Sequence, residues 1–461
     1  MIRRTLMRRA YNKGDWQTAK HHASKLTNIP KEQELARSVL IRACWNQEDY
    51  SEVIHLNSLW GNAFQALADR AEKSLQTKKS SEKSLYHPRI QAIHSSQPVP
   101  EESGIEWNDE DYIQNFIQEG SRLWMIHPHG WTHWDMPKEF VLSETHSDLL
   151  RLTAEILLYP WHKSTRSNLE GTRQLGTLPS LAFSAGTDST AAALIMPKNT
   201  ILGYHRRNFE GILDHRNADR LLEFMRNEKQ RRVIDISSNH ELLRTYHSKQ
   251  TGFSSDFACA SHLILLADHF DIGAIAFGMP LDNTWLMKGR TFREFTESQY
   301  FNYWTERFLK VGLELLLPIA GLSEAGAMKI CENEEILPYL NSCLRGDGTN
   351  GCGKCWKCFL KNGPLGRPFD IKANEIQVFL QRRPLPTAMH ALWALQQLQL
   401  ESEVPDLKEY LKQDLSWWKS YYPPAKEIIP ERWKEEIWQN ITHHLNSMEK
   451  PYPVEIIALS F

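Results

Sequence analysis

The stretch LPSLAFSAGTDSTAAALIM, residues 178–196, decides the fold that the rest of the sequence must fit. It consists of an apolar segment typical of a strand, a tight loop from Ser184 to Ser189, and an alanine-rich segment typical of a helix. A strand that passes directly into a helix aims the helix N-terminus and successive backbone N–H groups at one small volume, where an anion is stabilised. We therefore predict a phosphate-binding loop, with an ordinary strand-to-helix turn and its capping residues as the alternative.

The residue types in this loop suit a phosphate. Gly186 lets the backbone approach a ligand closely, and the hydroxyls of Ser184 and Ser189 add hydrogen-bond donors. Asp188 would repel a phosphate unless it recruits Mg²⁺ or orients the loop. The lysine of the GxxxxGK[ST] motif is missing, so the segment is not a Walker loop.

On both sides of the loop, residues 178–335 alternate short apolar runs with helical patterns, which predicts an α/β domain. The expected strands are LPSLAFS, TILGY, RRVIDIS, GAIAFG and LELLLPI, and the expected helices lie near 189–196, 214–229, 256–270 and 323–330. Such alternation indicates a parallel sheet with helices on both faces. Ligands of these sheets bind beyond the carboxyl ends of the strands.

Four of the seven cysteines fall within CLRGDGTNGCGKCWKC: Cys343, Cys352, Cys355 and Cys358. Four thiolates so close together suit a tetrahedral Zn²⁺ site, and a full set of protein ligands makes that metal structural. Two disulfides are the less favoured alternative. We assign residues 336–370 to a small zinc-binding subdomain. The GDGTNG segment inside it matches GxGxxG but follows no strand, which argues against dinucleotide binding.

The composition bounds the remaining possibilities. A chain of 461 residues suggests about two to four folded units. The hydrophobic fraction of 41% and charged fraction of 24% are those of a globular protein, and no apolar stretch is long enough for a membrane helix. With 54 basic and 56 acidic residues, no bulk field attracts nucleic acid, although a local basic groove stays possible. Seven cysteines without a signal peptide favour a cytoplasmic location.

The flanking regions carry weaker signals. Residues 1–75 contain a helix–turn–helix pattern twice, because Asp15-Trp16 recurs as Asp49-Tyr50 at a spacing of 34, the period of tetratricopeptide repeats. Two coincidental helical hairpins are the alternative. Residues 76–177 are interpreted as a polar linker and an aromatic-rich accessory region, and residues 371–461 as a helical C-terminal extension. In the accessory region His127, His129 and His133 could form a metal site, but the interspersed tryptophans favour packing.

The order Ser-x-Gly-x-Asp-Ser in residues 184–189 resembles the PP-loop of the N-type ATP pyrophosphatases, although Ala185 stands where most members have glycine. The later Ser-Cys and Cys-Gly-x-Cys-x-x-Cys segments make the chain similar to the 7-cyano-7-deazaguanine synthase (QueC) branch. Tyr204 and Arg207 look like its Tyr-Gly-Gln-Arg segment, and Gly278 ends a strand similar to its fourth. Lys361 stands where that branch has arginine. The resemblance covers about residues 178–365.

This resemblance implies a PP-loop ATP-binding domain at residues 178–335, with ATP and Mg²⁺ as cofactors. The ATP-binding residues that it implies are Ser184, Ala185, Gly186, Thr187, Asp188, Ser189, Tyr204, Arg207 and Gly278. Asp188, Lys288, Arg290 and Arg293 are the candidate catalytic residues, the three cations as stabilisers of phosphate charge or, alternatively, as parts of a solvated loop. Of the family's substrate-binding segment, that loop keeps only the sequence Arg-Glu-Phe, at residues 293–295.

By the same resemblance, the expected activity is an ATP-dependent C–N ligase. It would adenylate a carboxylate, of the deazaguanine type or related, release pyrophosphate, and use ammonia or an amine to form an amide or a nitrile. Long QueC-like proteins also occur in bacterial anti-phage defence, so residues 1–75 are expected to bind a partner protein that is modified. A PP-loop sulfur transferase or tRNA-modifying enzyme, and a nucleotide-sensing interaction module, are the alternatives.

Overall fold

The computed structural model describes residues 2–12, 15–47, 49–72, 74–75, 88–161, 168–209, 215–343 and 345–459. Residues 76–87 of the predicted linker lie outside this set. The chain forms two compact units: residues 1–96 with 245–250, and residues 97–244 with 251–461. Among the described residues, no helix combines the length and apolarity needed to cross a bilayer.

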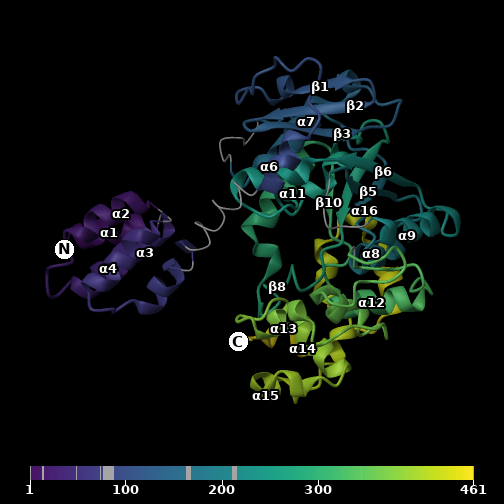
Figure 1. Ribbon diagram of the computed structural model, residues 1–461. Helices are drawn as coiled ribbons and strands as arrows, with labels where there is room; N and C mark the ends of the chain where they lie inside the picture. The colour runs from purple at the N-terminus through teal and green to yellow at the C-terminus, as the bar shows by residue number, and fades with distance from the viewer. Residues whose placement is uncertain are drawn as a thin grey trace. The chain divides into compact units, whose positions relative to one another are not determined.

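The first unit contains two helical hairpins built to one plan (Figure 1). They are α1 (Ile2–Asn12) with α2 (Trp16–Ser24), and α3 (Gln33–Asn46) with α4 (Tyr50–Leu59); α6 (Pro88–Ser95) follows. Asp15 accepts a hydrogen bond from the Thr18 amide at 3.1 Å and caps α2, and Asp49 caps α4 through the Glu52 amide at 3.4 Å. The predicted helix–turn–helix pattern is thus confirmed.

The 34-residue period is visible in the backbone of this unit. The amide of Asp15 donates to the carbonyl of Ala10 at 3.0 Å, and the amide of Asp49 donates to the carbonyl of Cys44 at the same distance. Each turn is closed by an edge-to-face aromatic pair, Tyr11 with Trp16 and Trp45 with Tyr50. Residues 34 positions apart therefore occupy equivalent positions in the two hairpins and make equivalent contacts.

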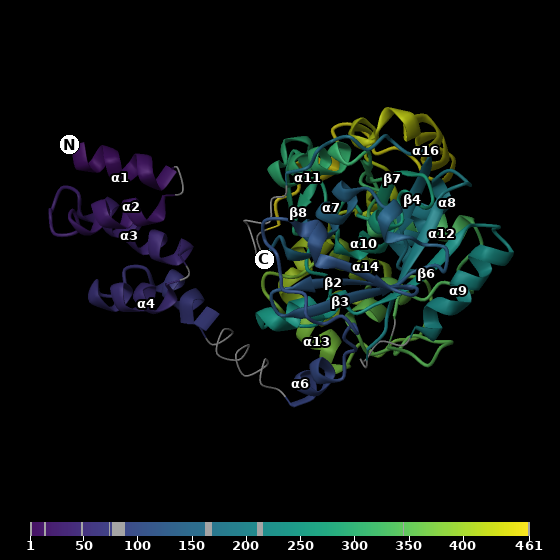
Figure 2. The same ribbon diagram turned by 90° about the horizontal axis from the view of Figure 1, so that it is seen from above.

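The second unit is organised around an eight-stranded sheet of order β1-β2-β3-β6-β5-β4-β7-β10 (Figures 1 and 2). The parallel strands are β4 (Leu178–Ala182), β5 (Ile201–Arg207), β6 (Val233–Ser238), β7 (Ile272–Phe277) and β10 (Glu314–Leu316). All five were predicted from the sequence. Successive strands extend the sheet from β4 to β6 on one side and from β4 to β7 and β10 on the other, so the order reverses between β4 and β7.

The sheet is mixed, which corrects the prediction of a purely parallel one. The aromatic accessory region supplies β1 (Phe116–Glu119), β2 (Arg122–His127) and β3 (Gly130–Asp135), an antiparallel meander. It joins the parallel strands where Trp134 pairs with Ser238 of β6. Leu123 and Met125 of β2 and Trp134 of β3 lie in the hydrophobic core. Packing, rather than metal binding, thus accounts for the tryptophans around His133.

Helices cover both faces of the parallel part of the sheet, because the side chains of the parallel strands alternate between two hydrophobic clusters. One face packs against α7 (Ser147–Leu158), α10 (Ser261–Leu265) and α11 (Gln299–Lys310). The other packs against α8 (Thr187–Ile195), α9 (Arg216–Asn227), α12 (Glu324–Asn333) and α16 (Glu431–His444). The helix predicted at 256–270 is short, since only 261–265 are α-helical after a 3₁₀ turn at 258–260.

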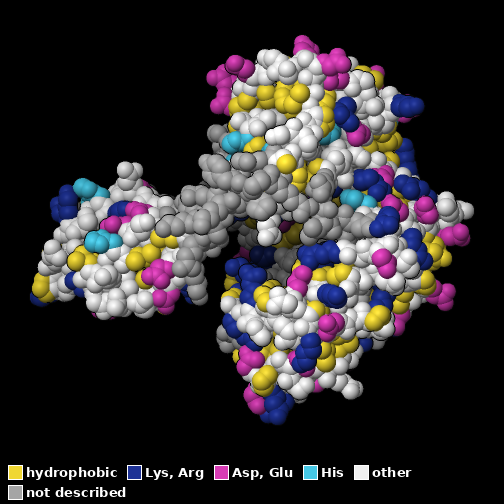
Figure 3. All heavy atoms as spheres, in the orientation of Figure 1, with side chains coloured by type: hydrophobic (Ala, Val, Ile, Leu, Met, Phe, Trp, Pro, Cys, Tyr) yellow, Lys and Arg dark blue, Asp and Glu magenta, His cyan; other side chains and the backbone are white. Residues whose placement is uncertain are grey.

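The C-terminal region is helical, as predicted, with α13 (Asn374–Gln381), α14 (Ala388–Gln397) and α15 (Lys408–Leu411) before α16. It packs into the same cores: Ile437 and Ile441 of α16 lie in the cluster that contains α8. A two-stranded sheet, β8 (Leu286–Met287) with β9 (Thr291–Phe292), sits in the loop after β7. On the face of this unit visible in Figure 3, basic and acidic side chains are interspersed rather than segregated.

Candidate functional site

A pocket of about 340 Å³ opens at the carboxyl ends of β4, β5 and β7, beside the point where the strand order reverses. This is the edge at which parallel α/β sheets bind ligands. Its lining includes Ser184, Gly186, Asp188, Ser189, Tyr204, Arg207 and Gly278, seven of the nine predicted ATP-binding residues. The fold therefore brings together segments that are up to about ninety positions apart in the sequence.

The predicted loop lies at the N-terminus of α8 and is held by its own side chains. The Ser184 and Ser189 hydroxyls lie 3.0 Å apart, and Ser189 also receives the Ser184 amide at 3.2 Å and donates to the Gly186 carbonyl at 3.1 Å. The Thr187 amide donates to the Ser342 hydroxyl at 3.1 Å, which ties the helix start to the segment before the first zinc-site cysteine. These bonds preorganise the loop around a small volume.

The backbone conformation at Ala185 and the small size of Gly278 shape the loop and its surroundings. Ala185 has φ of 56°, in the left-handed region that favours glycine. Gly278, after β7, faces the start of α8: a Cβ there would lie 2.9 Å from the Ser189 backbone nitrogen. Gly278 thus lets β7 approach the loop closely and shapes the pocket wall.

The far end of the pocket is a buried polar cluster on β5 and η4 (His240–His247). The Tyr204 hydroxyl lies 2.6 Å from Nδ1 of His215, and burial raises the pKa of Tyr204. Arg207 forms an ion pair with Glu241, which also lies 3.2 Å from Nε2 of His205. Burial raises the pKa of Glu241, but the hydrogen bond from His205 and the charge of Arg207 outweigh it and leave that pKa lowered. The carboxylate of Glu241 is therefore charged and fixed.

Behind the loop, Asp188 belongs to an ion network that the sequence pattern does not reveal. Lys361 donates to Asp188 Oδ2 at 2.5 Å and lies 3.5 Å from Glu324, which in turn lies 3.4 Å from Nε2 of His390. Asp282 completes the group and accepts the Glu324 amide at 3.4 Å. Lys361, three residues after Cys358, therefore anchors the loop of residues 184–189 through Asp188.

Electrostatics within this network follow from burial. Desolvation raises the pKa of Asp188, and it raises that of Asp282 well above its usual range, so Asp282 is neutral. For Glu324, desolvation is outweighed by Lys361 and His390, and its pKa is lowered. Lys361 thus faces two carboxyls, Asp188 and Glu324, while burial favours the protonated form of the third, Asp282.

Lys357, between Cys355 and Cys358, lines the pocket as Arg207 does, and no sequence motif singles it out. The three predicted cations lie elsewhere. Arg293 donates to the carbonyls of Thr284 at 2.5 Å and Asn283 at 2.7 Å, and the hairpin with Lys288 and Arg290 pairs with the C-terminal segment, where Leu459 donates to the Arg290 carbonyl at 2.9 Å. None of the three is among the residues that line the pocket.

The four cysteines meet the geometric requirements of a zinc site. Their sulfurs all lie within 4.8 Å of one another, with individual separations of 3.6 to 3.9 Å. A tetrahedral Zn²⁺ with bonds of about 2.3 Å sets sulfur atoms roughly 3.8 Å apart. The amides of Cys352 and Gly353 point at the Cys343 and Cys358 sulfurs at 3.4 and 3.3 Å, as in an outer shell that stabilises thiolates. Among the described residues, no other group of histidines, cysteines or carboxylates has metal-binding geometry.

Burial raises the pKa of two further thiols of this unit, Cys259 and Cys331. Cys259 lines the pocket, but burial raises its pKa to about 12. Cys331 is fully buried in α12 and donates to the Thr187 carbonyl at 3.7 Å. Neither thiol therefore forms a thiolate readily at neutral pH.

Comparison with known proteins yields little that bears on the pocket. Residues 303–452 match the model of a family of unknown function, DUF6395. This match begins in α11 and includes the four cysteines, but not the loop at residues 184–189. No curated protein and no solved structure matches the chain significantly.

Proposed function

We propose that the chain is an ATP-dependent ligase that binds ATP in the pocket at the carboxyl ends of β4, β5 and β7. The observation that carries the proposal is the loop of residues 184–189, whose hydroxyls and helix N-terminus face that pocket together with Lys357. Amide donors, a helix dipole and one lysine are the groups that stabilise a polyphosphate. Tyr204 and Arg207 line the other end, where the nucleoside would lie.

In the proposed reaction, a carboxylate oxygen of the substrate attacks the α-phosphorus of ATP, which enters as its Mg²⁺ complex. The bond from that phosphorus to the bridging oxygen breaks, and pyrophosphate leaves with the electron pair. An amine or ammonia then attacks the acyl carbon, AMP leaves with the electron pair of the C–O bond, and the nitrogen loses a proton to form an amide. Lys357 and the loop amides would stabilise the charge that develops on the phosphates.

The resemblance to the QueC branch supports a heterocyclic carboxylate of the deazaguanine type as the substrate. The zinc site would then be structural and hold Lys357 and Lys361 in place. The paired hairpins of residues 1–75 support a role in binding a partner protein, as in a defence system that modifies one of its own components.

Sulfur transfer is the weaker alternative, because the one thiol in the pocket, Cys259, has a pKa raised to about 12 by burial. A sulfur transferase needs a thiolate near the adenylated atom. The four clustered cysteines would be committed to zinc.

The products of ATP cleavage test the proposal. The full-length protein is incubated with ATP labelled at the α or γ phosphate, with a panel of heterocyclic carboxylates and ammonia. We expect AMP and pyrophosphate, and a large loss of both in Ser189→Ala, whereas Ser416→Ala, an exposed serine outside the pocket, behaves as the wild type. ADP and phosphate as the products would contradict the proposal.

A further inference from the structure

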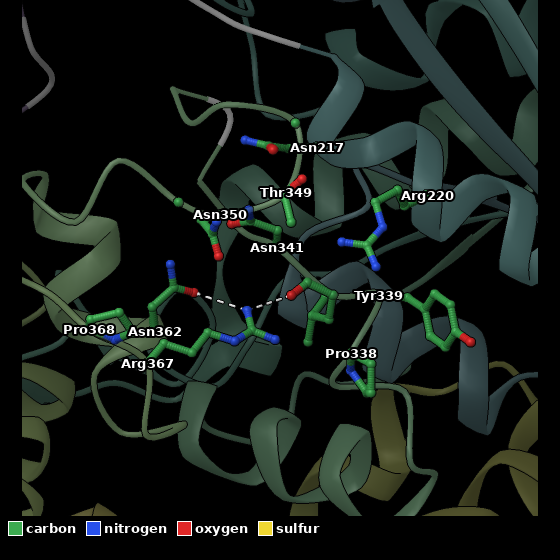
Figure 4. A pocket seen from close by; sticks show the side chains of 13 residues that line it. Asn217, Arg220, Pro338, Tyr339, Asn341, Thr349, Asn350, Asn362, Arg367 and Pro368 are labelled. Carbon is green, nitrogen blue, oxygen red and sulfur yellow. Dashed lines mark hydrogen bonds between the residues drawn. The ribbon is translucent and has the colours of Figure 1, made fainter.

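A second pocket, of about 300 Å³, lies beside the zinc-site segment (Figure 4). Its walls come from the first turn of α9, from residues 338–341, from the loop 348–351, and from Asn362, Arg367 and Pro368. The loop wall is fixed, because Asp347 accepts the amides of Thr349 and Asn350, both at 2.8 Å. The site is therefore built by the same turn that positions the cysteines.

Two groups in this pocket lack partners. Asn217 is 2% exposed; its Nδ2 donates to the Cys343 carbonyl at 2.7 Å, whereas its buried Oδ1 accepts no hydrogen bond from any described residue. A buried acceptor without a donor costs free energy, which a ligand N–H would recover. Arg220 lies one helical turn further along α9 and, within the described part of the chain, forms no ion pair.

The neighbouring cation does not compete for a ligand. Arg367 donates to the Leu340 carbonyl at 2.5 Å and also to the carbonyl of Leu337, so it holds the backbone of the wall. In Figure 4 the Arg220 and Arg367 side chains lie on opposite sides of the open volume. The free guanidinium of Arg220 is therefore the group available to an anion.

The pocket adjoins the nucleotide pocket through a shared residue. Asn341 lines both, and the next residue, Ser342, accepts the Thr187 amide at the start of α8. Asn341 would thus separate a ligand in this pocket from the loop of residues 184–189.

We infer that this pocket binds an α-amino acid, whose carboxylate pairs with Arg220 and whose ammonium donates to Asn217 Oδ1. Residues three apart on a helix present neighbouring side chains, so the acceptor and the guanidinium suit a ligand with both groups on one carbon. This inference rests on the proposed function for the role of the ligand. Once its ammonium has lost one proton, the amino acid supplies the amine that attacks the acyl carbon; AMP then leaves and the nitrogen loses a second proton.

Calorimetric titration of the zinc-loaded, full-length protein without ATP tests the binding site separately from the reaction. The probes are a panel of α-amino acids and, for each one that binds, the amine without its carboxylate and the hydroxy acid without its ammonium. We expect both analogues to bind at least tenfold more weakly. Arg220→Gln should weaken amino acid binding by about 10- to 100-fold, because a charge-assisted hydrogen bond is lost. Arg226→Gln, an exposed arginine in the last turn of the same helix, should leave it unchanged.

Absence of binding by every amino acid at millimolar concentration, equal binding by Arg220→Gln, or equal binding of either analogue would overturn this inference. Amino acid binding that needs Arg220, in a protein that releases no pyrophosphate, would retain the site and reject the ligase.

Discussion

Lys361 shows how much one residue contributes when it is buried among carboxyls. It contacts Asp188 and Glu324, and its side chain is only 9% exposed. We predict that Lys361→Met lowers the free energy of unfolding by about 3–5 kcal/mol, since removing one member of a buried ion pair leaves an uncompensated charge. Urea denaturation measures this. The control is Lys329→Met, whose partner Glu332 is exposed, and which should change stability by less than about 0.5 kcal/mol. Equal effects of the two substitutions would contradict the assignment.

His133 predicts a pH dependence of stability. Burial, assisted by the charge of Arg122 and opposed by Asp135, lowers its pKa to about 4, and Nε2 lies 2.6 Å from the Asn208 amide nitrogen. The folded pKa lies below the unfolded one, so the folded state favours the neutral ring. Stability is full above about pH 6.5 and falls as the pH drops toward 4, by roughly 3 kcal/mol in total.

Urea titrations between pH 7 and 4 check this contribution of His133. In His133→Gln, which keeps a side-chain acceptor, the loss of stability over that range should be smaller than in the wild type by about the same amount. Identical profiles for the two proteins would show that His133 does not titrate in this way.

At the scale of elements, the segment that carries the four cysteines also contributes Lys357 to the pocket in which we propose that ATP binds. Lys357 and Lys361 lie within or just after the four cysteines, so their positions depend on the fold of that segment. We predict one zinc per chain by elemental analysis, and its loss in Cys355→Ser. Removal of zinc should weaken ATP binding at least tenfold, because Lys357 then loses its position in the pocket. A zinc-free protein that binds ATP as tightly as the zinc-loaded one would contradict this link.

How far the sequence predicts each element depends on the range of the interactions that form it. The loop at 184–189 and the cysteine cluster were located because their residues are neighbours in the chain. The meander β1–β3 was missed, since its histidines and tryptophans do not alternate cleanly with polar residues. The contact of Lys361 with Asp188 spans 173 positions, and nothing local marks it. Lys357 was passed over in favour of three cations that contact backbone carbonyls or the C-terminal segment.

At the scale of the whole molecule, the proposal assigns a different role to each of the two units. The second unit contains the sheet, the pocket at the carboxyl ends of β4, β5 and β7, the four cysteines and the C-terminal helices. The first holds the paired hairpins. We expect nucleotide chemistry to belong entirely to the second unit and partner choice to the first.

ATP binding by the full-length protein tests the central claim most directly. Calorimetric titration with Mg·ATP should show one site in the wild type, and Lys357→Met should weaken it by about 10- to 100-fold, since a charge-assisted contact to phosphate is lost. Lys354→Met removes an exposed lysine from the same cysteine segment, outside the pocket, and should bind ATP as the wild type does. No ATP binding by the wild-type protein, or equal affinities of the two variants, would contradict the assignment of this pocket.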